Sequence, residues 1–349
     1  MRDFWDPRPQ RVAVFRALQL GDMLCAVPAF RALRAFLPRA RITLVGLPWA
    51  ASFAQRYAHL IDDFIAFPGW PGNPESDAPV APMLDALIAC QQRHFDVAIQ
   101  MHGSGALSNR VVAMMGAQRV GGFGVGRPSF LRWPDSQNEI HRYLSLMSFL
   151  GVPLQGDHLE MPLTAEDEAD ARGVMQRHGL LPGHFVCLHP GSQLPSRRWP
   201  VERFAAVGTA LCRQGWRIAV TGTPGERDLT DTLLRSLPRG AVDLNGATTL
   251  GSLAALVRES ALLVCNDTGI SHVAAAVGAR SVVVASGSDV PRWRPLDRSR
   301  HPVLWHDVPC RPCTHRTCPT NHECALGVAV DTVLAEARRL LPERLPHAA

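Results

Sequence analysis

The sequence predicts an α/β protein with mainly parallel sheets, built as two Rossmann-like domains. Its 349 residues exceed what one hydrophobic core usually serves. Short apolar runs typical of buried strands alternate with helical patterns, and this alternation favours βαβ units. The alternation restarts after a connection at about 151–163. We therefore expect an N-terminal domain over residues 1–163 and a second domain over 164–328.

In the first domain, a strand at 11–17 precedes a helix at 23–38 that Pro38 ends. A second strand is expected at 41–47, and later strands of the same sheet at 95–103 and 118–125. The Pro- and Gly-rich stretch 67–82 is typical of a loop.

The second domain is expected to open with a helix over 164–180, because Thr164 and Asp167 have the spacing of a capping box. A strand at 184–191 and a helix at 200–215 follow. Pro at the start of that helix and Gly at its end are favourable positions for both residues. Further strands separated by helices are expected at 216–222, 241–246, 261–267 and 280–286.

The basic residues of this chain are all arginine, 36 in number, and lysine is absent. Mechanisms that need a Schiff-base lysine or a P-loop lysine are therefore excluded. The net charge of +5 suits an anionic substrate or an acidic membrane surface. Because the arginines are scattered along the chain, a nucleic-acid-binding stripe is not expected.

The first ten residues lack the apolar stretch of a signal peptide, and the apolar runs of the sequence are short for a membrane span. We therefore expect a cytoplasmic protein whose nine cysteines are thiols. Five of them stand singly in apolar surroundings, which is typical of small core residues: Cys25, Cys90, Cys187, Cys212 and Cys265.

Ligands of open α/β sheets bind beyond the carboxyl ends of the strands, so the loops after strands are the places to search. The first such loop contains Gly21, which permits a tight turn, and Asp22 at the start of a helix. Asp22 can be an ordinary N-cap. Alternatively it is a carboxylate exposed in an interdomain cleft and able to act as a general base.

Two further loops carry residues suited to a nucleotide. Ser192 follows Pro and Gly, and Arg197 stands in an arginine pair just before a helix. Small residues and arginines suit a phosphate, although arginine pairs are often solvated surface. Glu226 lies near the start of a helix, where it can cap that helix or accept hydrogen bonds from a ribose diol.

The fourth loop, in LLVCNDTGISHVAAAVG (262–278), places Asp267, Thr268 and Gly269 at a strand-to-helix corner. Free N–H groups at a helix N-terminus favour an anion, and a glycine there leaves room for a diphosphate. Asp267 would orient the loop rather than touch phosphate. His272, in the first turn of an Ala/Val helix, is either a ligand contact or a satisfied core histidine.

A cysteine-rich segment lies near the C-terminus and contains Cys310, Cys313, Cys318 and Cys324. A Cys-x-x-Cys pair followed by two further cysteines can form a structural zinc site. The spacing is tighter than in common zinc ribbons, so packed thiols or a redox-sensitive pair remain the alternative. No metal is expected in the active site.

Three of these segments resemble glycosyltransferase family 9, the heptosyltransferases of lipopolysaccharide core assembly. They are LGDMLCAVPAFRALR (20–34), HPGSQLPSRRWPVERF (189–204) and NDTGISHVAAAVG (266–278). Their order and spacing hold from about residue 12 to 340. The resemblance implies a GT-B architecture, in which the two domains face each other across a cleft. It also implies that a C-terminal helix within 329–349 packs back on the N-terminal domain.

The resemblance further implies an inverting transfer of a sugar from a nucleotide-diphospho-sugar, with ADP-heptose favoured and no cofactor required. Asp22 matches the general base, Arg197 a basic catalytic residue, and Glu226 the residue that holds the ribose. Thr268, Gly269 and His272 match diphosphate and sugar contacts. Arg197 departs from the family, many members of which have lysine there, and this leaves the identity of the donor sugar open.

We therefore expect a cytoplasmic enzyme of the lipopolysaccharide-core type. Its acceptor would be a lipid-linked saccharide, so peripheral contact with the inner membrane is expected, and no nucleic acid. The alternatives are a sugar-nucleotide epimerase-like GT-B enzyme and a non-catalytic accessory protein that binds nucleotide sugars. The sequence does not give the acceptor, the linkage or the oligomeric state.

Overall fold

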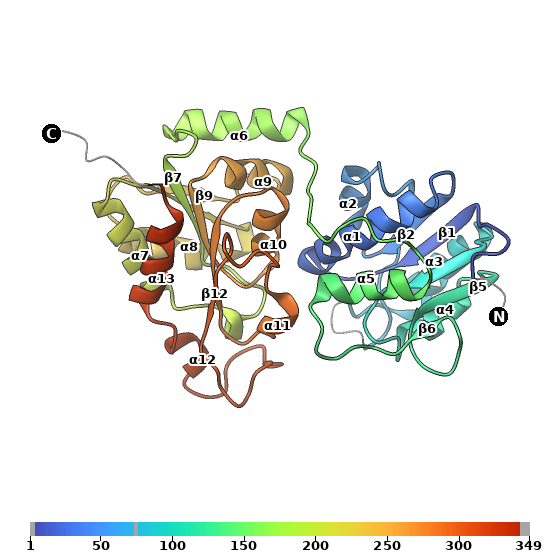
Figure 1. Cartoon of the computed structure of the whole chain (residues 1–349). Coiled ribbons are helices and arrows are strands. Elements are labelled where there is room, and N and C mark those ends of the chain that lie inside the picture. The colour runs from blue at the N-terminus through green and yellow to red at the C-terminus, as the bar shows by residue number, and fades with distance from the viewer. Residues whose placement is uncertain (1–3, 73–75, 343–349) are drawn as a thin grey trace. The chain divides into compact units, whose positions relative to one another are not determined.

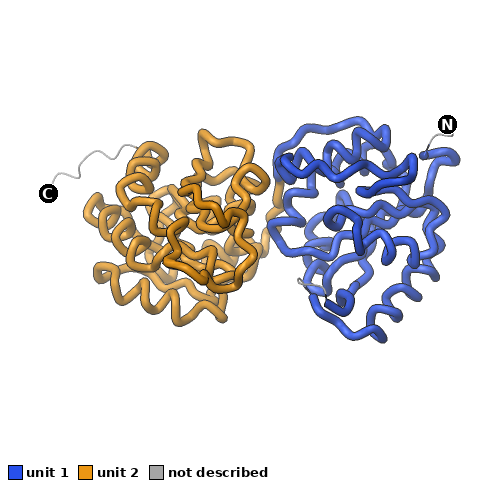
Figure 2. Tube along the Cα trace, turned by 90° about the horizontal axis from the view of Figure 1, so that it is seen from below, with its two compact units in different colours: residues 1–159 blue, residues 160–349 orange. Residues whose placement is uncertain are grey.

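The computed structural model describes residues 4–72 and 76–342, and these form two compact units, residues 1–159 and 160–349 (Figure 2). The division lies four residues before the boundary expected between 163 and 164. Within the described residues each unit has one sheet of six strands, and the strands of both sheets pair in parallel. The prediction of an α/β fold with two Rossmann-like units is thereby confirmed.

Unit 1 has the strand order β3-β2-β1-β4-β5-β6. Its elements are β1 Arg11–Phe15, α1 Leu20–Phe36, β2 Arg41–Gly46, α2 Ala50–Arg56, β3 Asp63–Ala66, α3 Val80–Gln92, β4 Val97–Gln100, α4 Ser108–Met114, β5 Arg119–Phe123, β6 Phe130–Leu131 and α5 Glu139–Phe149 (Figure 1). The order in which successive strands are placed across the sheet reverses between β1 and β4. These two strands pair in parallel, with Phe15 opposite Gln100. A crevice at the carboxyl ends of two such strands is the usual ligand position of this fold.

Unit 2 repeats the same order, read as β9-β8-β7-β10-β11-β12. Its strands are β7 Phe185–His189, β8 Arg217–Gly222, β9 Val242–Asn245, β10 Leu262–Asn266, β11 Ser281–Ala285 and β12 Val303–Trp305. Its helices are α6 Ala165–His178, η1 Pro195–Arg197, α7 Val201–Arg213, η2 Pro224–Glu226, α8 Arg227–Ser236, α9 Leu250–Glu259, α10 Gly269–Ala276, α11 Val290–Trp293, α12 Glu323–Leu326 and α13 Val330–Leu340. Here the equivalent reversal lies between β7 and β10.

The strands at these reversals are buried on both faces, as parallel sheets covered by helices require. Four of the five residues of β1 and all those of β7 and β10 are buried. The capping box expected at Thr164 is present: its hydroxyl accepts from the Asp167 amide at 3.1 Å and the Asp167 carboxylate accepts from the Thr164 amide at 2.9 Å.

Helix α13 packs within unit 2, and the packing of a C-terminal helix on the N-terminal domain, which the resemblance implies, stays a prediction. Its buried side chains Val333, Leu334, Ala337 and Leu340 lie in one core with Val282 of β11 and other residues of unit 2. The helix packs against α7, β10 and β11. Its apolar face is thus buried against the sheet that precedes it in the chain.

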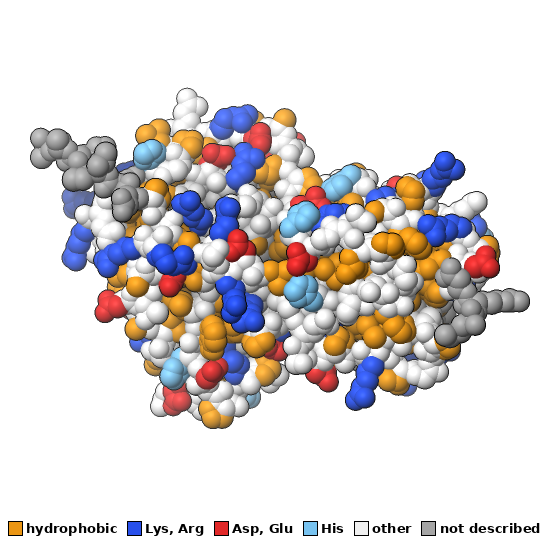
Figure 3. Space-filling model, viewed as in Figure 1, with side chains coloured by type: hydrophobic (Ala, Val, Ile, Leu, Met, Phe, Trp, Pro, Cys, Tyr) orange, Lys and Arg blue, Asp and Glu red, His pale blue; other side chains and the backbone are white. Residues whose placement is uncertain are grey.

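Two observations bear on possible partners, one on the side chains at the surface and one on the helices. On the face shown in Figure 3, arginine side chains are spread among hydrophobic and acidic ones, as their scatter along the sequence indicated. Among the helices that the structure describes, none is both long and apolar enough to cross a membrane.

Candidate functional site

The first candidate site of unit 2 lies where β7 and β10 end side by side. Asn266, the last residue of β10, is fully buried and connects the loops there. Its Nδ2 donates to the carbonyls of Pro190 at 2.7 Å and Gly191 at 3.3 Å, and its Oδ1 accepts from the Trp199 amide at 2.8 Å. One amide side chain therefore fixes the loop after β7 against the corner after β10.

The corner at 267–272 follows directly. Thr268 is the N-cap of α10 with an extended backbone (φ −155°, ψ 176°), and its hydroxyl makes no capping hydrogen bond to the helix. Gly269 is the first helical residue, so the unpaired N–H groups and positive dipole end of α10 begin there. The corner thus offers backbone donors and a hydroxyl to an anion.

Asp267 and His272 flank this helix start and are both buried. The Asp267 amide donates to the Val284 carbonyl at 2.9 Å, which continues the ladder of β10 past its end. The His272 ring lies edge-on to Trp293 of α11, with 6.3 Å between ring centroids. Both residues therefore shape the corner, and an interaction with a ligand stays a prediction for each.

Glu226 lies at the end of η2, beside the loop after β7. Its Oε2 accepts from both the amide and the hydroxyl of Thr223, each at 2.9 Å, so the capping reading of this residue holds. Its carboxylate also occupies the space above Gly191, where a Cβ would lie 2.1 Å from Oε1. Gly191 thus permits the carboxylate to reach the carboxyl edge of the sheet.

A buried histidine that sequence reasoning did not select interacts electrostatically with this carboxylate. His189 ends β7, and its Nδ1 is 3.0 Å from the Thr221 hydroxyl. Burial lowers the pKa of His189, and the charge of Glu226 opposes this shift. A strand-end histidine in HPG was visible in the sequence, but its electrostatic interaction with Glu226 depends on the pairing of β7 with β8.

Ser192 and Arg197 lie on the segment between β7 and α7. Ser192 is buried, and its carbonyl accepts from Arg198 Nε at 2.9 Å. Arg197, at the end of η1, donates through Nη2 to the Cys313 carbonyl at 3.4 Å. Its Nε is buried and has no hydrogen-bond partner within the described residues. A guanidinium with an unused buried donor is suited to hold an anionic ligand.

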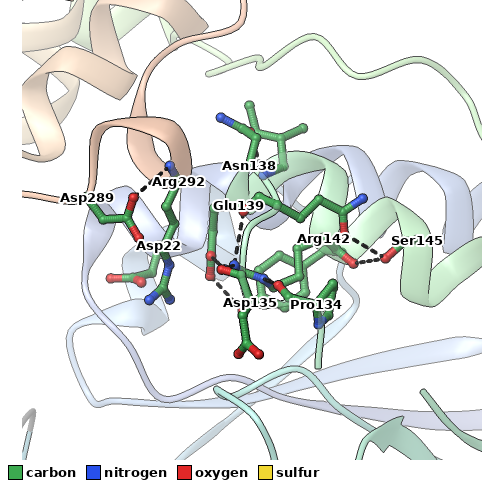
Figure 4. Close-up of polar contacts among 12 residues, drawn as sticks. Asp22, Pro134, Asp135, Asn138, Glu139, Arg142, Ser145, Asp289 and Arg292 are labelled. Carbon is green, nitrogen blue, oxygen red and sulfur yellow. Dashed lines mark hydrogen bonds and ion pairs between the residues drawn. The ribbon is translucent and has the colours of Figure 1, made fainter. Parts of the chain in front are cut away.

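Other buried polar atoms at this edge of the sheet are also without partners in the part of the chain that the structure describes. They are the Oγ atoms of Ser286 and Ser288, two residues that follow β11, and the Oδ1 atom of Asn245, the last residue of β9. Buried polar groups are paired in most native structures, so a group of exceptions indicates contacts that a ligand or water completes. Next to them, the Asp289 carboxylate caps α11 by accepting from the Arg292 amide at 3.3 Å (Figure 4).

The cysteine-rich segment lines a small cavity with all four of its cysteines and His315. Across the described residues, however, no three His, Cys, Asp or Glu side chains group closely enough to hold a metal ion, and the four cysteines are free thiols. The structural zinc site is therefore not supported. The segment instead holds η1: Ser196 Oγ donates to the His315 carbonyl at 2.6 Å, and the His322 ring lies 2.8 Å from the Ser196 carbonyl.

In unit 1, Asp22 is the third residue of α1 rather than its N-cap, which is Gln19. Gly21 is likewise helical, since α1 begins at Leu20 and not at 23 as expected. Asp22 is half-buried, in a first turn where its charge suits the helix dipole. The interpretation of Asp22 as an ordinary N-cap is thus wrong.

The sequence model of one family, described as glycosyltransferase family 9 (heptosyltransferase), matches residues 88–323. Lipopolysaccharide heptosyltransferase 2 of Escherichia coli K12 is 22% identical over 306 residues, covering 82% of this chain and 85% of that protein. Lipooligosaccharide heptosyltransferase 2 of Haemophilus influenzae is 30% identical over 111 residues, 30% of this chain and 32% of that protein. For the first three curated relatives, the chain spans only 32%, 51% and 50% of their length.

Solved structures resemble the chain over nearly its whole length. The glycosyl transferase family 9 structure from Veillonella parvula has a TM-score of 0.81 at 22% identity and covers 98% of both chains. The E. coli ADP-heptose lps heptosyltransferase II structure has a TM-score of 0.72 at 19% identity, covering 95% of this chain and 98% of that one. At these identities the likeness shows a shared fold.

Proposed function

The chain belongs to glycosyltransferase family 9, and from that membership we propose that it is an inverting glycosyltransferase acting on a lipopolysaccharide-core-type acceptor. The donor that we favour is ADP-heptose, since the relatives named above are lipopolysaccharide and lipooligosaccharide heptosyltransferases. The proposal assigns the catalytic base to unit 1 and the donor contacts to unit 2.

The observation that carries this proposal is the carboxyl edge of β7, β8 and β10. Asn266 joins the Gly191 loop to a helix start whose N-cap hydroxyl is not used for capping. Arg197 supplies a buried donor without a partner among the described residues. Together these groups match a diphosphate, and the Glu226 carboxylate beside them matches a ribose diol.

In the proposed reaction, an acceptor hydroxyl oxygen attacks the anomeric carbon of the donor sugar as the bond to the phosphate oxygen breaks. The hydroxyl proton passes to the Asp22 carboxylate. Negative charge then builds on the departing nucleoside diphosphate. Arg197, Thr268 and the first amides of α10 would stabilise that charge, and preorganised donors of this kind are effective where water is excluded.

We propose a lipid-linked saccharide as acceptor and therefore peripheral contact with the cytoplasmic face of the inner membrane. The net charge of +5 favours an anionic surface. Sedimentation with liposomes of anionic and of neutral lipid checks this contact. Binding to the anionic vesicles alone is expected, and failure to sediment with either would contradict it.

Calorimetric titration with ADP, UDP, GDP and ADP-heptose tests the donor assignment. We expect ADP and ADP-heptose to bind and the other two nucleotides to bind at least about tenfold more weakly, a difference of about 1.4 kcal/mol. Preference for UDP or GDP would keep the mechanism and discard heptose. Absence of binding to all four would overturn the proposed function. Binding of ADP-heptose without any transfer would favour the non-catalytic accessory protein, and turnover of donor without acceptor would indicate an epimerase.

Substituting Gly191→Ala is expected to weaken ADP binding by about 10- to 100-fold. The new Cβ would lie 2.1 Å from Glu226 Oε1, so the flexible carboxylate must leave this position and lose a charged hydrogen bond to the ribose, worth about 1.5–3 kcal/mol. Folding stability should fall by no more than about 1 kcal/mol, because the carboxylate also leaves its hydrogen bonds to Thr223 while the backbone stays in place. Gly225→Ala is the matched control, since its Cβ meets only Thr223 Oγ1, at 4.0 Å. Equal ADP affinity in both variants would remove Glu226 from the site.

A further inference from the structure

A fully buried arginine lies beneath the start of α1. Arg16 follows β1 directly, and its side chain is 0% exposed. Its Nε and Nη2 donate to the Asp22 carbonyl at 3.1 and 2.5 Å, and its Nη1 donates to the Met101 carbonyl at 2.5 Å. The guanidinium therefore ties the first turn of α1 to the loop after β4, at the reversal point of the sheet.

A second layer holds Arg16 in place. The Tyr143 ring lies under the guanidinium, with 4.1 Å between the Arg16 Cζ and the ring centroid. Glu139 Oε1 is 3.9 Å from Arg16 Nη2 and accepts from the Tyr143 hydroxyl at 2.9 Å. Tyr143 and Glu139 are also fully buried, and both come from α5, which packs along α1.

Glu139 is itself positioned by the start of α5. Asn138 caps that helix through the Ile140 amide at 3.1 Å, and Arg142 pairs with the Glu139 carboxylate one turn later. Arg142 in turn donates to the Pro134 carbonyl at 3.1 Å and to Asp135, so the loop before α5 is included (Figure 4). A chain of contacts thus runs from this loop to the backbone of Asp22.

The charges in this chain of contacts explain how a guanidinium can be buried here. Removing a guanidinium from water is costly unless opposite charge and hydrogen bonds replace the solvent. Burial lowers the pKa of Arg16, but Tyr143, Asp22 and Glu139 raise it by more, so the cation is retained. The other ionisable group facing Arg16 is His102, and burial and the Arg16 charge lower its pKa to about 4, which keeps it neutral.

We propose that Arg16 is a positioning residue for Asp22, fixing the first turn of α1 and the direction of the carboxylate, and that Glu139 and Tyr143 hold Arg16 for this purpose. This inference rests on the proposed role of Asp22 as the general base. Asp22 also interacts electrostatically with Arg16, so loss of the cation removes a charge that favours the ionised carboxylate.

The test compares Arg16→Lys and Arg16→Met with Arg34→Lys in sugar transfer from ADP-heptose. Arg34 is a matched control, because it is a mostly buried arginine that bonds the Leu60 and Ala40 carbonyls at the far end of α1. We expect Arg16→Met to lower kcat about 10- to 100-fold, as displacements near 1 Å do, with the donor KM within about threefold. Arg16→Lys should recover part of kcat, and Arg34→Lys should leave both constants near wild type.

The pH profile separates positioning from simple destabilisation. In Arg16→Met the acid limb of kcat/KM should move to higher pH, whereas Arg34→Lys should not move it. Tyr143→Phe, which keeps the ring and removes the hydrogen bond to Glu139, is a milder variant for the case in which Arg16→Met does not fold. It should lower kcat in the same sense. An unmoved limb and unchanged kcat in folded variants would overturn the proposal.

A readout that does not need turnover keeps this inference distinct from the proposed function. Hydrogen exchange of the first-turn amides of α1, such as Met23, should quicken in Arg16→Met and Tyr143→Phe more than in Arg34→Lys. If wild type transfers no sugar, the proposed function fails whatever the exchange shows. If wild type is active and exchange is unchanged in these variants, the positioning role fails alone.

Discussion

Replacing Asp22 with asparagine is expected to lower sugar transfer by about 10²- to 10⁴-fold while donor binding stays at the wild-type level. The amide is nearly isosteric with the carboxylate but does not accept the proton of the acceptor hydroxyl, and general-base catalysis contributes about this factor. Donor binding should persist because the groups proposed for it belong to unit 2. Steady-state transfer and calorimetric ADP binding measure the two quantities.

Asp85→Asn is the matched control for this variant. Asp85 is an exposed aspartate on α3 of the same unit, so its loss changes the net charge equally without touching α1. Transfer by Asp85→Asn should equal that of wild type. If Asp22→Asn kept more than a tenth of the wild-type kcat, Asp22 would not be the base and a different carboxylate would have to be sought.

The strand and helix alternation was predictable because apolar periodicity is a local property of the chain. Both central strands of each sheet follow from it, and so do the segments after these strands that carry Asp22, Ser192 and Thr268. The edge elements were missed, since β6 has two residues and α3 begins inside the Pro- and Gly-rich stretch that was expected to be a loop. Such elements depend on their neighbours for stability more than on their own pattern.

Long-range placement was the part that the sequence did not determine. The amphipathic pattern of α13 indicates a buried face but not which sheet buries it, and the structure places it on unit 2. Spacing of Cys310 and Cys313 suggested zinc without fixing the distances to Cys318 and Cys324. The segment holds the Arg197 turn through backbone carbonyls instead, a function that leaves no motif in the sequence.

Residues that act through tertiary contacts were hidden for the same reason. From the sequence alone, Arg16 is expected to be exposed at the surface, because buried arginines are rare unless they are paired. Its partner Glu139 lies 123 positions away in the sequence, and their meeting depends on the packing of α5 along α1. Asn266 was visible in the strand-to-helix corner, but its role in joining two loops required the pairing of β7 with β10.

Substituting Thr268→Ala is expected to weaken donor binding by about 10- to 100-fold without loss of stability. A hydrogen bond to a charged phosphate is worth about 1.5–3 kcal/mol, and the free hydroxyl of Thr268 is proposed to make one. Adding His272→Ala should weaken binding further. Calorimetric titration with ADP and ADP-heptose measures the affinity, and urea unfolding measures the stability of the same samples.

Thr249→Ala gives the opposite pattern and so tests the argument. Thr249 is also an N-cap in unit 2, but its hydroxyl does cap, accepting from the Ser252 amide at 3.1 Å. Its loss should cost about 1 kcal/mol of folding stability and leave ADP affinity unchanged. Thr268 makes no such bond, so an alanine there should affect the ligand and not the helix. A Thr268→Ala protein that is destabilised yet binds ADP as wild type does would mean that this hydroxyl serves the fold, and the anion site would then rest on the α10 amides and Arg197 alone.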